Sequence, residues 1–296
     1  MTQIRTRQVV PTEKAAREPS RPWLAVGLFV LGAGAALVAL LGPLAGDVIR
    51  YHASEGAINQ IIGGDVAGLL LVAPVSVFAG ILVLRGRTTG AVLALGPSVY
   101  ALYMYSQLAL GGDFVRYQGN SERFFLLYLG LFVIAGAIAI RAWAMIDSDR
   151  LPVTKRWVDR TLGVFFLVVA AFLVVGLHLP GLVDAWADQP TSAEYLADPA
   201  VFWLVKFMDL GLVVPGLVIT GVGILSARPW VAKLEYAAVG WAALLGSSVA
   251  GMAVVMQMTG DPAASVANTV AFGSFAAIAL AMAAVLYAPL LRKDFR

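Results

Sequence analysis

Long apolar runs separated by short polar segments dominate the chain, and the length of these runs decides the predicted fold. A helix needs about 20 residues to cross roughly 30 Å of hydrocarbon, and a window of that length identifies eight candidate membrane spans. The spans cover residues 23–44, 66–84, 91–110, 124–140, 161–180, 203–226, 235–258 and 267–290. The pattern therefore predicts an all-α fold, a polytopic membrane bundle of eight transmembrane helices.

Composition supports this prediction. Of the 296 residues, 60% are hydrophobic and 13% are charged, which excludes a soluble domain of this size. The first span follows a basic arm but is longer than the apolar region of a signal peptide, so we expect a retained helix. The chain has no cysteine, which excludes disulfides, thiolate metal sites and iron–sulfur clusters.

The distribution of basic residues predicts the orientation in the membrane. If the N-terminus is inside, the cytoplasmic segments hold 17 Lys and Arg residues and the outer loops hold 3. Cytoplasmic loops of membrane proteins carry such an excess, so we expect both termini in the cytoplasm and a location in the cell (inner or plasma) membrane. No basic face is interleaved with aromatic residues, so a nucleic-acid partner is not expected.

An internal repeat is suggested by two similar segments. AGILVLRGR (79–87) and GVGILSARP (221–229) align Gly80 with Gly223, an offset of 143 residues. Each segment ends a span that follows a long outer loop, and each span has an acidic residue near its outer end (Asp65, Asp209) and a proline within it (Pro74, Pro215). Because the same order of loops and spans occurs twice along the chain, the sequence favours two four-helix halves.

Each half would hold an even number of spans, so the two halves would be parallel rather than inverted. The predicted division of the chain has five parts, in order along the sequence. They are a basic cytoplasmic arm (1–22), a first four-helix half (23–140), a cytoplasmic linker (141–160), a second four-helix half (161–290) and a basic cytoplasmic tail (291–296).

Polar residues within the spans gather in the outer half of the membrane. Tyr100, Tyr103 and Gln107 share one face of the third span, and ionisable groups inside a membrane usually face a bundle interior or water. This clustering predicts a polar cavity that opens to the extracytoplasmic side and binds a small molecule or lipid. The candidate ligand-binding residues are Asp65, Tyr100, Tyr103, Gln107, Lys206 and Asp209.

Simpler interpretations remain open at this point. Lys206 and Asp209 are three residues apart on the sixth span and can reach each other; Lys206 can also extend to the membrane surface, with Asp209 neutralising it. The tyrosines can form an aromatic belt at the membrane interface instead of lining a cavity.

Most catalytic and cofactor motifs are absent. The chain has no GxxxxGK[ST] loop, no HExxH, no GxSxG and no metal-binding Cys/His spacing. A metal site built from His52, His178, Glu55 and Asp65 has no fixed spacing to support it, so no metal is predicted. The sequence identifies no cofactor and no catalytic residue.

Two segments carry a resemblance to other proteins: RGRTTGAVLALGPSVYALYMYSQLALGG and NSERFFLLYLGLFVIAGAIA. Their pattern is an Arg-Gly turn, a tyrosine-rich outer half of the third span, and a polar segment with asparagine before an aromatic-led fourth span. It resembles a group of uncharacterised bacterial multi-pass membrane proteins over about a third of the chain. The resemblance rests on Arg85, Gly86, Tyr100, Tyr103, Tyr105 and Asn120. It implies a membrane family and no transferable activity.

Three functions fit these observations. The first is binding or transport of a small molecule or lipid, and the alternative is a structural or accessory subunit of a membrane complex. The third is a membrane-embedded enzyme acting on a lipid-linked substrate, with Asp65, Glu122 or Asp209 as acid or base. The missing catalytic motifs favour a role that is not enzymatic. The expected partners are the lipid bilayer, a small-molecule or lipid ligand, and an oligomer or complex partner.

Overall fold

The computed structural model describes residues 20–294, and all regular secondary structure in that range is helical. Most of the predicted basic arm (residues 1–19) and the last two residues of the tail lie outside the described residues. The N-terminal elements are α1 (Ser20–Leu41), α2 (Glu55–Ala67), η1 (Gly68–Val72), α3 (Ala73–Leu84), α4 (Thr88–Leu110), η2 (Ser121–Phe124) and α5 (Phe125–Met145). The C-terminal elements are η3 (Ser148–Arg150), α6 (Arg156–Ala171), η4 (Phe172–His178), α7 (Leu179–Ala185), α8 (Ala193–Ala197), α9 (Pro199–Met208), η5 (Asp209–Val213), α10 (Val214–Leu225), α11 (Val231–Thr259) and α12 (Val266–Asp294).

Within the described residues, 7 helical segments are long and apolar enough to cross a membrane. They are Arg21–Leu41, Glu55–Leu84, Ser121–Met145, Arg156–Ala185, Pro199–Leu225, Val231–Thr259 and Val266–Arg292, and each overlaps a predicted span. The prediction of a multi-pass helical membrane protein is thus confirmed at this level. The remaining predicted span, 91–110, lies in α4, which has 23 residues and no charge. Its tyrosines, serines, proline and glutamine lower its mean hydropathy, and α4 is not among the seven.

The second membrane helix begins earlier than the apolar pattern predicts, at Glu55 rather than at residue 66. Ser54 caps α2 by accepting a hydrogen bond from the Ala57 amide. The first turns of α2 are polar, yet they pack inside the protein, where the Asn59 amide donates a 3.0 Å hydrogen bond to Asp261. The helix therefore begins before the apolar run does, because its polar first turns are stabilised by a residue that is distant in sequence.

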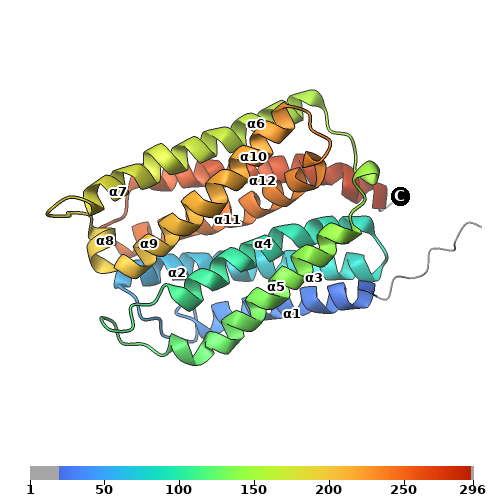
Figure 1. The fold of residues 1–296 in the computed structure, drawn as a ribbon. Coiled ribbons are helices and arrows are strands. Elements are labelled where there is room, and N and C mark those ends of the chain that lie inside the picture. Colours follow the sequence, from blue (N-terminus) through green and yellow to red (C-terminus); the bar gives the residue numbers. More distant parts are fainter. Residues whose placement is uncertain (1–19, 295–296) are drawn as a thin grey trace, which may run out of the picture.

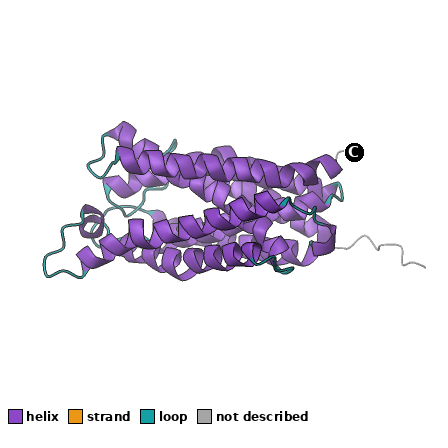
Figure 2. Cartoon of the chain, turned by 90° about the horizontal axis from the view of Figure 1, so that it is seen from above, coloured by secondary structure: helices purple, strands orange, loops and turns teal. Residues whose placement is uncertain are grey.

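The helices run alongside one another in two groups (Figure 1). The group formed by α1 to α5 packs against the group formed by α6 to α12, and α1 begins at the same end of the bundle at which α12 ends. Figure 2 shows the same bundle from above, with the connecting loops at its two ends. Where α4 crosses α11, a Cβ on Gly96 would lie 3.0 Å from the carbonyl carbon of Gly240. Two glycines thus let these central helices approach closely.

The loops at the end away from the chain termini join the two groups. Arg116 Nη1 donates hydrogen bonds to the carbonyl oxygens of Leu196 (2.7 Å) and Ala197 (2.8 Å). The Ser54 amide donates to the carboxylate of Asp198 at 3.1 Å. Because Ser54 precedes α2 and Asp198 precedes α9, these contacts place the starts of two broken helices side by side.

Between residues 20 and 294, three of the long apolar segments contain a π-helical turn, and in each a proline follows two residues after that turn. The turns η1, η4 and η5 end at Val72, His178 and Val213, and the prolines are Pro74, Pro180 and Pro215. Proline has no amide hydrogen, and its ring collides with the carbonyl four residues earlier. A wider turn at that point relieves the collision, and such turns are frequent at functional sites.

The turns after α3 and α10 have the same hydrogen bonds. The amides of Arg85, Gly86 and Arg87 donate to the carbonyls of Ile81, Val83 and Leu82. Those of Ser226, Ala227 and Arg228 donate to the carbonyls of Val222, Ile224 and Gly223. Gly86 has φ 72° and Ala227 has φ 50°. The matching residues of the two turns are 141 positions apart.

Candidate functional site

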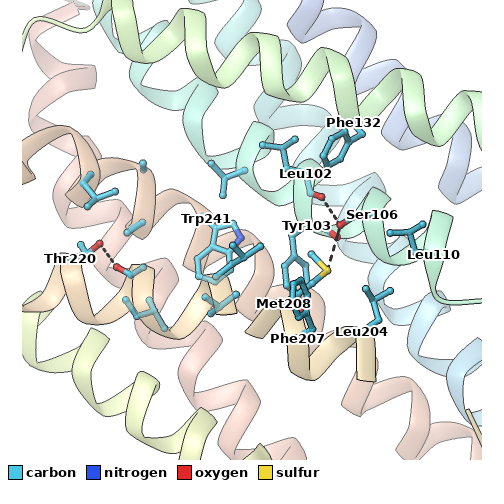
Figure 3. A pocket seen from close by; sticks show the side chains of 18 residues that line it. Leu102, Tyr103, Ser106, Leu110, Phe132, Leu204, Phe207, Met208, Thr220 and Trp241 are labelled. Atoms are coloured by element: carbon cyan, nitrogen blue, oxygen red, sulfur yellow. Dashed lines mark hydrogen bonds between the residues drawn. The ribbon is translucent and has the colours of Figure 1, made fainter. Parts of the chain in front are cut away.

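A groove of about 560 Å³ lies between α4, α11 and the broken helix α9–η5–α10, with one contribution from α5. Figure 3 shows the side chains that surround it. The lining is Val99, Leu102, Tyr103, Ser106, Leu110, Phe132, Leu204, Phe207, Met208, Leu212, Val213, Gly216, Leu217, Thr220, Leu234, Ala237, Ala238 and Trp241. We call this cavity the apolar groove.

The apolar groove is long and opens sideways. Its wall runs from Leu204 to Thr220, which corresponds to about 24 Å at roughly 1.5 Å per helical residue. That length is most of the roughly 30 Å hydrocarbon core of a bilayer. Phe207 and Leu212, on the rim, are 73% and 63% exposed. In a helix that crosses a membrane, exposed apolar side chains of this kind are compatible with contact with hydrocarbon.

Most polar side chains in the lining already have hydrogen-bond partners, and the indole of Trp241 is the exception. Ser106 Oγ donates to the carbonyl of Leu102 at 2.9 Å and lies 3.5 Å from Met208 Sδ; the first contact and the second are drawn in Figure 3. Thr220 Oγ1 donates to the carbonyl of Gly216 at 2.7 Å. The indole nitrogen of Trp241 is buried without a partner. A ligand in the groove therefore meets mainly hydrocarbon.

Behind this wall lies a buried polar network centred on Asp209. The hydroxyl of Tyr103 donates to Asp209 Oδ1 at 2.6 Å, and His178 Nε2 lies 2.9 Å from Asp209 Oδ2. The network joins α4, η4 and η5, and Gln107 lies beside the Tyr103 hydroxyl. Because an ionised carboxylate can only accept hydrogen bonds, Nε2–H of His178 donates in this contact, and His178 Nδ1 is buried without a partner.

Lys206 is buried beside this network and forms no ion pair within residues 20–294. Its Nζ lies 3.3 Å from the centroid of the Phe202 ring, a cation–π contact. The side chain is 4% exposed and packs close to Gly181. Asp209, three residues away, uses both of its oxygens for Tyr103 and His178 instead.

Asp65 and Tyr100 line a different, smaller cavity of about 30 Å³ between α1, α2 and α4. Asp65 Oδ2 is buried without a hydrogen-bond partner, and the Tyr100 hydroxyl donates to Ser248 Oγ at 3.3 Å. The structure thus divides the six candidate ligand-binding residues. It brings Tyr103, Gln107 and Asp209 together and leaves Asp65 and Tyr100 elsewhere.

Two parts of the site were missed from the sequence. His178 is the partner of Asp209, and the signal that marks it is its place two residues before Pro180, where η4 ends. The apolar lining gave no signal, because Leu204, Leu212 and Phe132 look like any lipid-facing residue in a membrane helix. A groove of this kind exists only where helices stay apart, which hydropathy does not report.

Glu122, the remaining candidate acid, contacts a histidine outside the groove. Glu122 Oε2 lies 2.7 Å from His52 Nε2, whose Nδ1 is 2.7 Å from the carbonyl of Tyr117. Burial lowers the pKa of His52, but its contacts with Tyr117 and Glu122 outweigh burial and place the pKa above the ordinary value. In the described part of the chain, no three His, Asp or Glu side chains are arranged to hold a metal ion.

No family model, no curated protein and no solved structure matches this chain.

Proposed function

We propose that this membrane protein binds the hydrocarbon chain of a lipid in the apolar groove. The observation that carries the proposal is a cavity of about 560 Å³ with a mainly apolar lining, which includes the exposed apolar side chains of Phe207 and Leu212. A hydrocarbon chain gives up no hydrogen bonds to water when it enters such a lining, because it has no polar groups.

The length of the groove suits an extended chain. The groove follows the broken helix α9–η5–α10 for about 24 Å, and an extended hydrocarbon chain can lie along that length without needing a polar partner. A ligand of this shape favours lipid binding over the role of an accessory subunit at this site.

The proposed topology keeps eight spans, with α4 as the one that hydropathy alone does not support. The start of α1 and the end of α12 at one end of the bundle favour an even number of crossings (Figure 1). The excess of basic residues in the connecting segments near that end favours a cytoplasmic position for both termini. In this orientation the Asp209 network lies toward the extracytoplasmic side of a cell membrane.

The two-half architecture is also part of the proposal, with an offset of 141 instead of 143. That offset superposes the hydrogen bonds of the two turns, Gly86 on Ala227 and Pro74 on Pro215. It also superposes η1 (Gly68–Val72) on η5 (Asp209–Val213). Membership of the bacterial multi-pass family that the sequence resembles stays a prediction.

A substitution at Gly216 tests the function directly. Gly216 lines the groove, and a Cβ built on it meets no atom within 4 Å, so Gly216→Phe introduces a large side chain at the groove from a position where the backbone leaves room for a Cβ. Gly211→Phe is the matched control, because Gly211 is in the same broken helix, has equally open space and does not line the groove. Native mass spectrometry of protein extracted in mild detergent should show bound lipid on the wild type and the control. We expect about tenfold less on Gly216→Phe.

A second readout reports the position of the chain. Trp241 is buried and lines the groove, so a variant keeping Trp241 as its single tryptophan should be quenched in bilayers of phosphatidylcholine brominated on its acyl chains. Gly216→Phe should abolish that quenching. Wild-type protein without bound lipid and without quenching would refute the proposal, and retention of a second protein chain instead would favour the accessory-subunit alternative.

A further inference from the structure

The apolar groove lies in one of two helix contacts that the proposed repeat makes equivalent. With the 141-residue offset, α2 corresponds to α9 and α4 corresponds to α11. The contact of α2 with α11 therefore corresponds to the contact of α9 with α4. The inference below rests on the proposed lipid-binding function and on this offset.

The contact between α2 and α11 is closed. A Cβ on Gly63 would lie 2.3 Å from the backbone nitrogen of Met252 and 2.5 Å from the carbonyl carbon of Gly251. A Cβ on Gly251 would in turn lie 2.8 Å from the carbonyl oxygen of Gly63. The two backbones touch there, as glycines permit in membrane helices, and no side chain separates them.

The contact between α9 and α4 is looser and is made by side chains. Ser106 meets Met208 at 3.5 Å, and Tyr103 meets Asp209 at 2.6 Å. Near the end of α4, a Cβ on Gly111 would lie at an ordinary 3.4 Å from the Val201 side chain. No backbone contact like that at Gly63 occurs among these residues.

The difference follows from the residues at the equivalent positions. An offset of 141 places Leu204 where α2 has Gly63, and Leu110 where α11 has Gly251. Both leucines line the apolar groove. The α2–α11 contact thus has two glycines that allow the backbones to touch, and the α9–α4 contact has two leucines at the equivalent positions.

We propose that Leu110 and Leu204 hold α9 away from α4 and thereby determine the width of the groove and the class of ligand it accepts. Leu204 is partly buried and Leu110 is 61% exposed, and each adds side-chain volume at a place where the first half has a glycine in backbone contact. A closed contact has no room for that volume, so the space between the helices stays open to one extended hydrocarbon chain. They are specificity-determining residues. Smaller residues at these positions let α9 approach α4 and close the groove.

The test compares Leu110→Ala/Leu204→Ala with a matched control, Leu70→Ala/Leu126→Ala. Leu70 and Leu126 are exposed leucines outside the groove. Alanine is used because it permits close approach and keeps helix propensity. The chain has no cysteine, so cysteines for spin labels can be placed at Val133 on α5 and Ile219 on α10, on either side of the groove. Electron–electron distance measurements and native mass spectrometry are made on each protein in bilayer nanodiscs of phosphatidylcholine.

In Leu110→Ala/Leu204→Ala the distance between the labels should shorten by a few ångströms and the bound lipid should fall about tenfold, while the control changes neither. An unchanged distance, or a wider groove with more bound lipid, would overturn the inference while leaving lipid binding by the wild type intact. Loss of lipid from the wild type itself would refute the proposed function instead. If the double variant does not fold, Leu204→Ala alone is measured, and the same two outcomes decide.

Discussion

The hydroxyl of Tyr103 donates a 2.6 Å hydrogen bond to Oδ1 of Asp209, and this contact joins the wall of the apolar groove to a buried acid on a π-helical turn. One side of the tyrosine ring faces hydrocarbon, while its polar tip is bonded away from the groove. The Asp209 carboxylate therefore lies close to the apolar groove while its two oxygens are bonded to Tyr103 and His178.

Removing this hydroxyl should affect stability more than ligand binding. Tyr103→Phe keeps the ring in the groove but leaves Asp209 without one of its two partners, and we expect a loss of about 2 kcal/mol in the free energy of unfolding. Thermal unfolding in detergent measures the loss, with bound lipid quantified in parallel. Tyr100→Phe is the control, because the longer 3.3 Å contact of Tyr100 with Ser248 should contribute less. Equal effects of the two substitutions would contradict the role assigned to Asp209.

Gly63→Ala should be strongly destabilising. Its Cβ would collide with the backbone of α11 at 2.3 Å, and backbone cannot move aside cheaply, so we expect a loss of about 3 kcal/mol. Gly68→Ala, five residues later on the same broken helix, meets no atom within 4 Å and should be neutral or stabilising by up to about 1 kcal/mol. Unfolding curves and the monodispersity of both variants decide between these outcomes.

The two equivalent turns allow a reciprocal test of backbone strain. Ala227 has a positive φ of 50°, which glycine adopts without steric cost, so Ala227→Gly should stabilise the protein by about 0.5–1 kcal/mol. Gly86 has φ 72°, so Gly86→Ala should lower the free energy of unfolding of the protein by about 1 kcal/mol. Opposite signs of the two effects are expected in the same unfolding assay, and the same sign for both would contradict the geometry of the turns.

The contact between His52 and Glu122 should make the outer loop sensitive to pH. The pKa of His52 is higher in the folded protein than its ordinary value of 6.5, so folding favours the protonated ring. The stabilisation is then fully present below about pH 6.5 and is lost as pH rises through the folded pKa. Hydrogen exchange of residues 51–53 between about pH 5 and about pH 9 should show protection that falls with pH in the wild type. In Glu122→Gln the fall should be smaller; an identical fall would mean that Glu122 does not raise the pKa.

Hydropathy predicted most of the fold because burial in lipid selects long apolar runs. The predicted span 91–110 lies in α4, whose tyrosines and glutamine lower its hydropathy and which is not among the seven apolar segments; α3, α5 and α11 pack against this helix. Hydropathy missed the early start of α2, where Asn59 is stabilised by Asp261. The apolar pattern is interrupted where a polar side chain has a partner that is distant in sequence.

The candidate site was harder to predict for a related reason. Depth in the membrane was enough to associate Tyr103, Gln107 and Asp209, since all three lie at similar positions along neighbouring helices. Depth does not tell toward which neighbouring helix a side chain points. The prediction from depth therefore also included Asp65 and Tyr100, which line another cavity. The spacing of Lys206 and Asp209 suggested a pair, but the carboxylate is bonded to His178 and Tyr103 and the ammonium lies over Phe202.

The π-helical turn η5 also fixes the rotational phase between the two parts of its helix. Each residue of an α-helix advances the chain by about 100° around the axis, and a π turn accommodates one more residue than an α turn. Without that residue, α9 would be rotated by about 100° relative to α10, and Leu204 would no longer point toward α4. The groove wall and the partners of Asp209 thus depend on a single inserted residue, and deleting Gly211 would shift both at once.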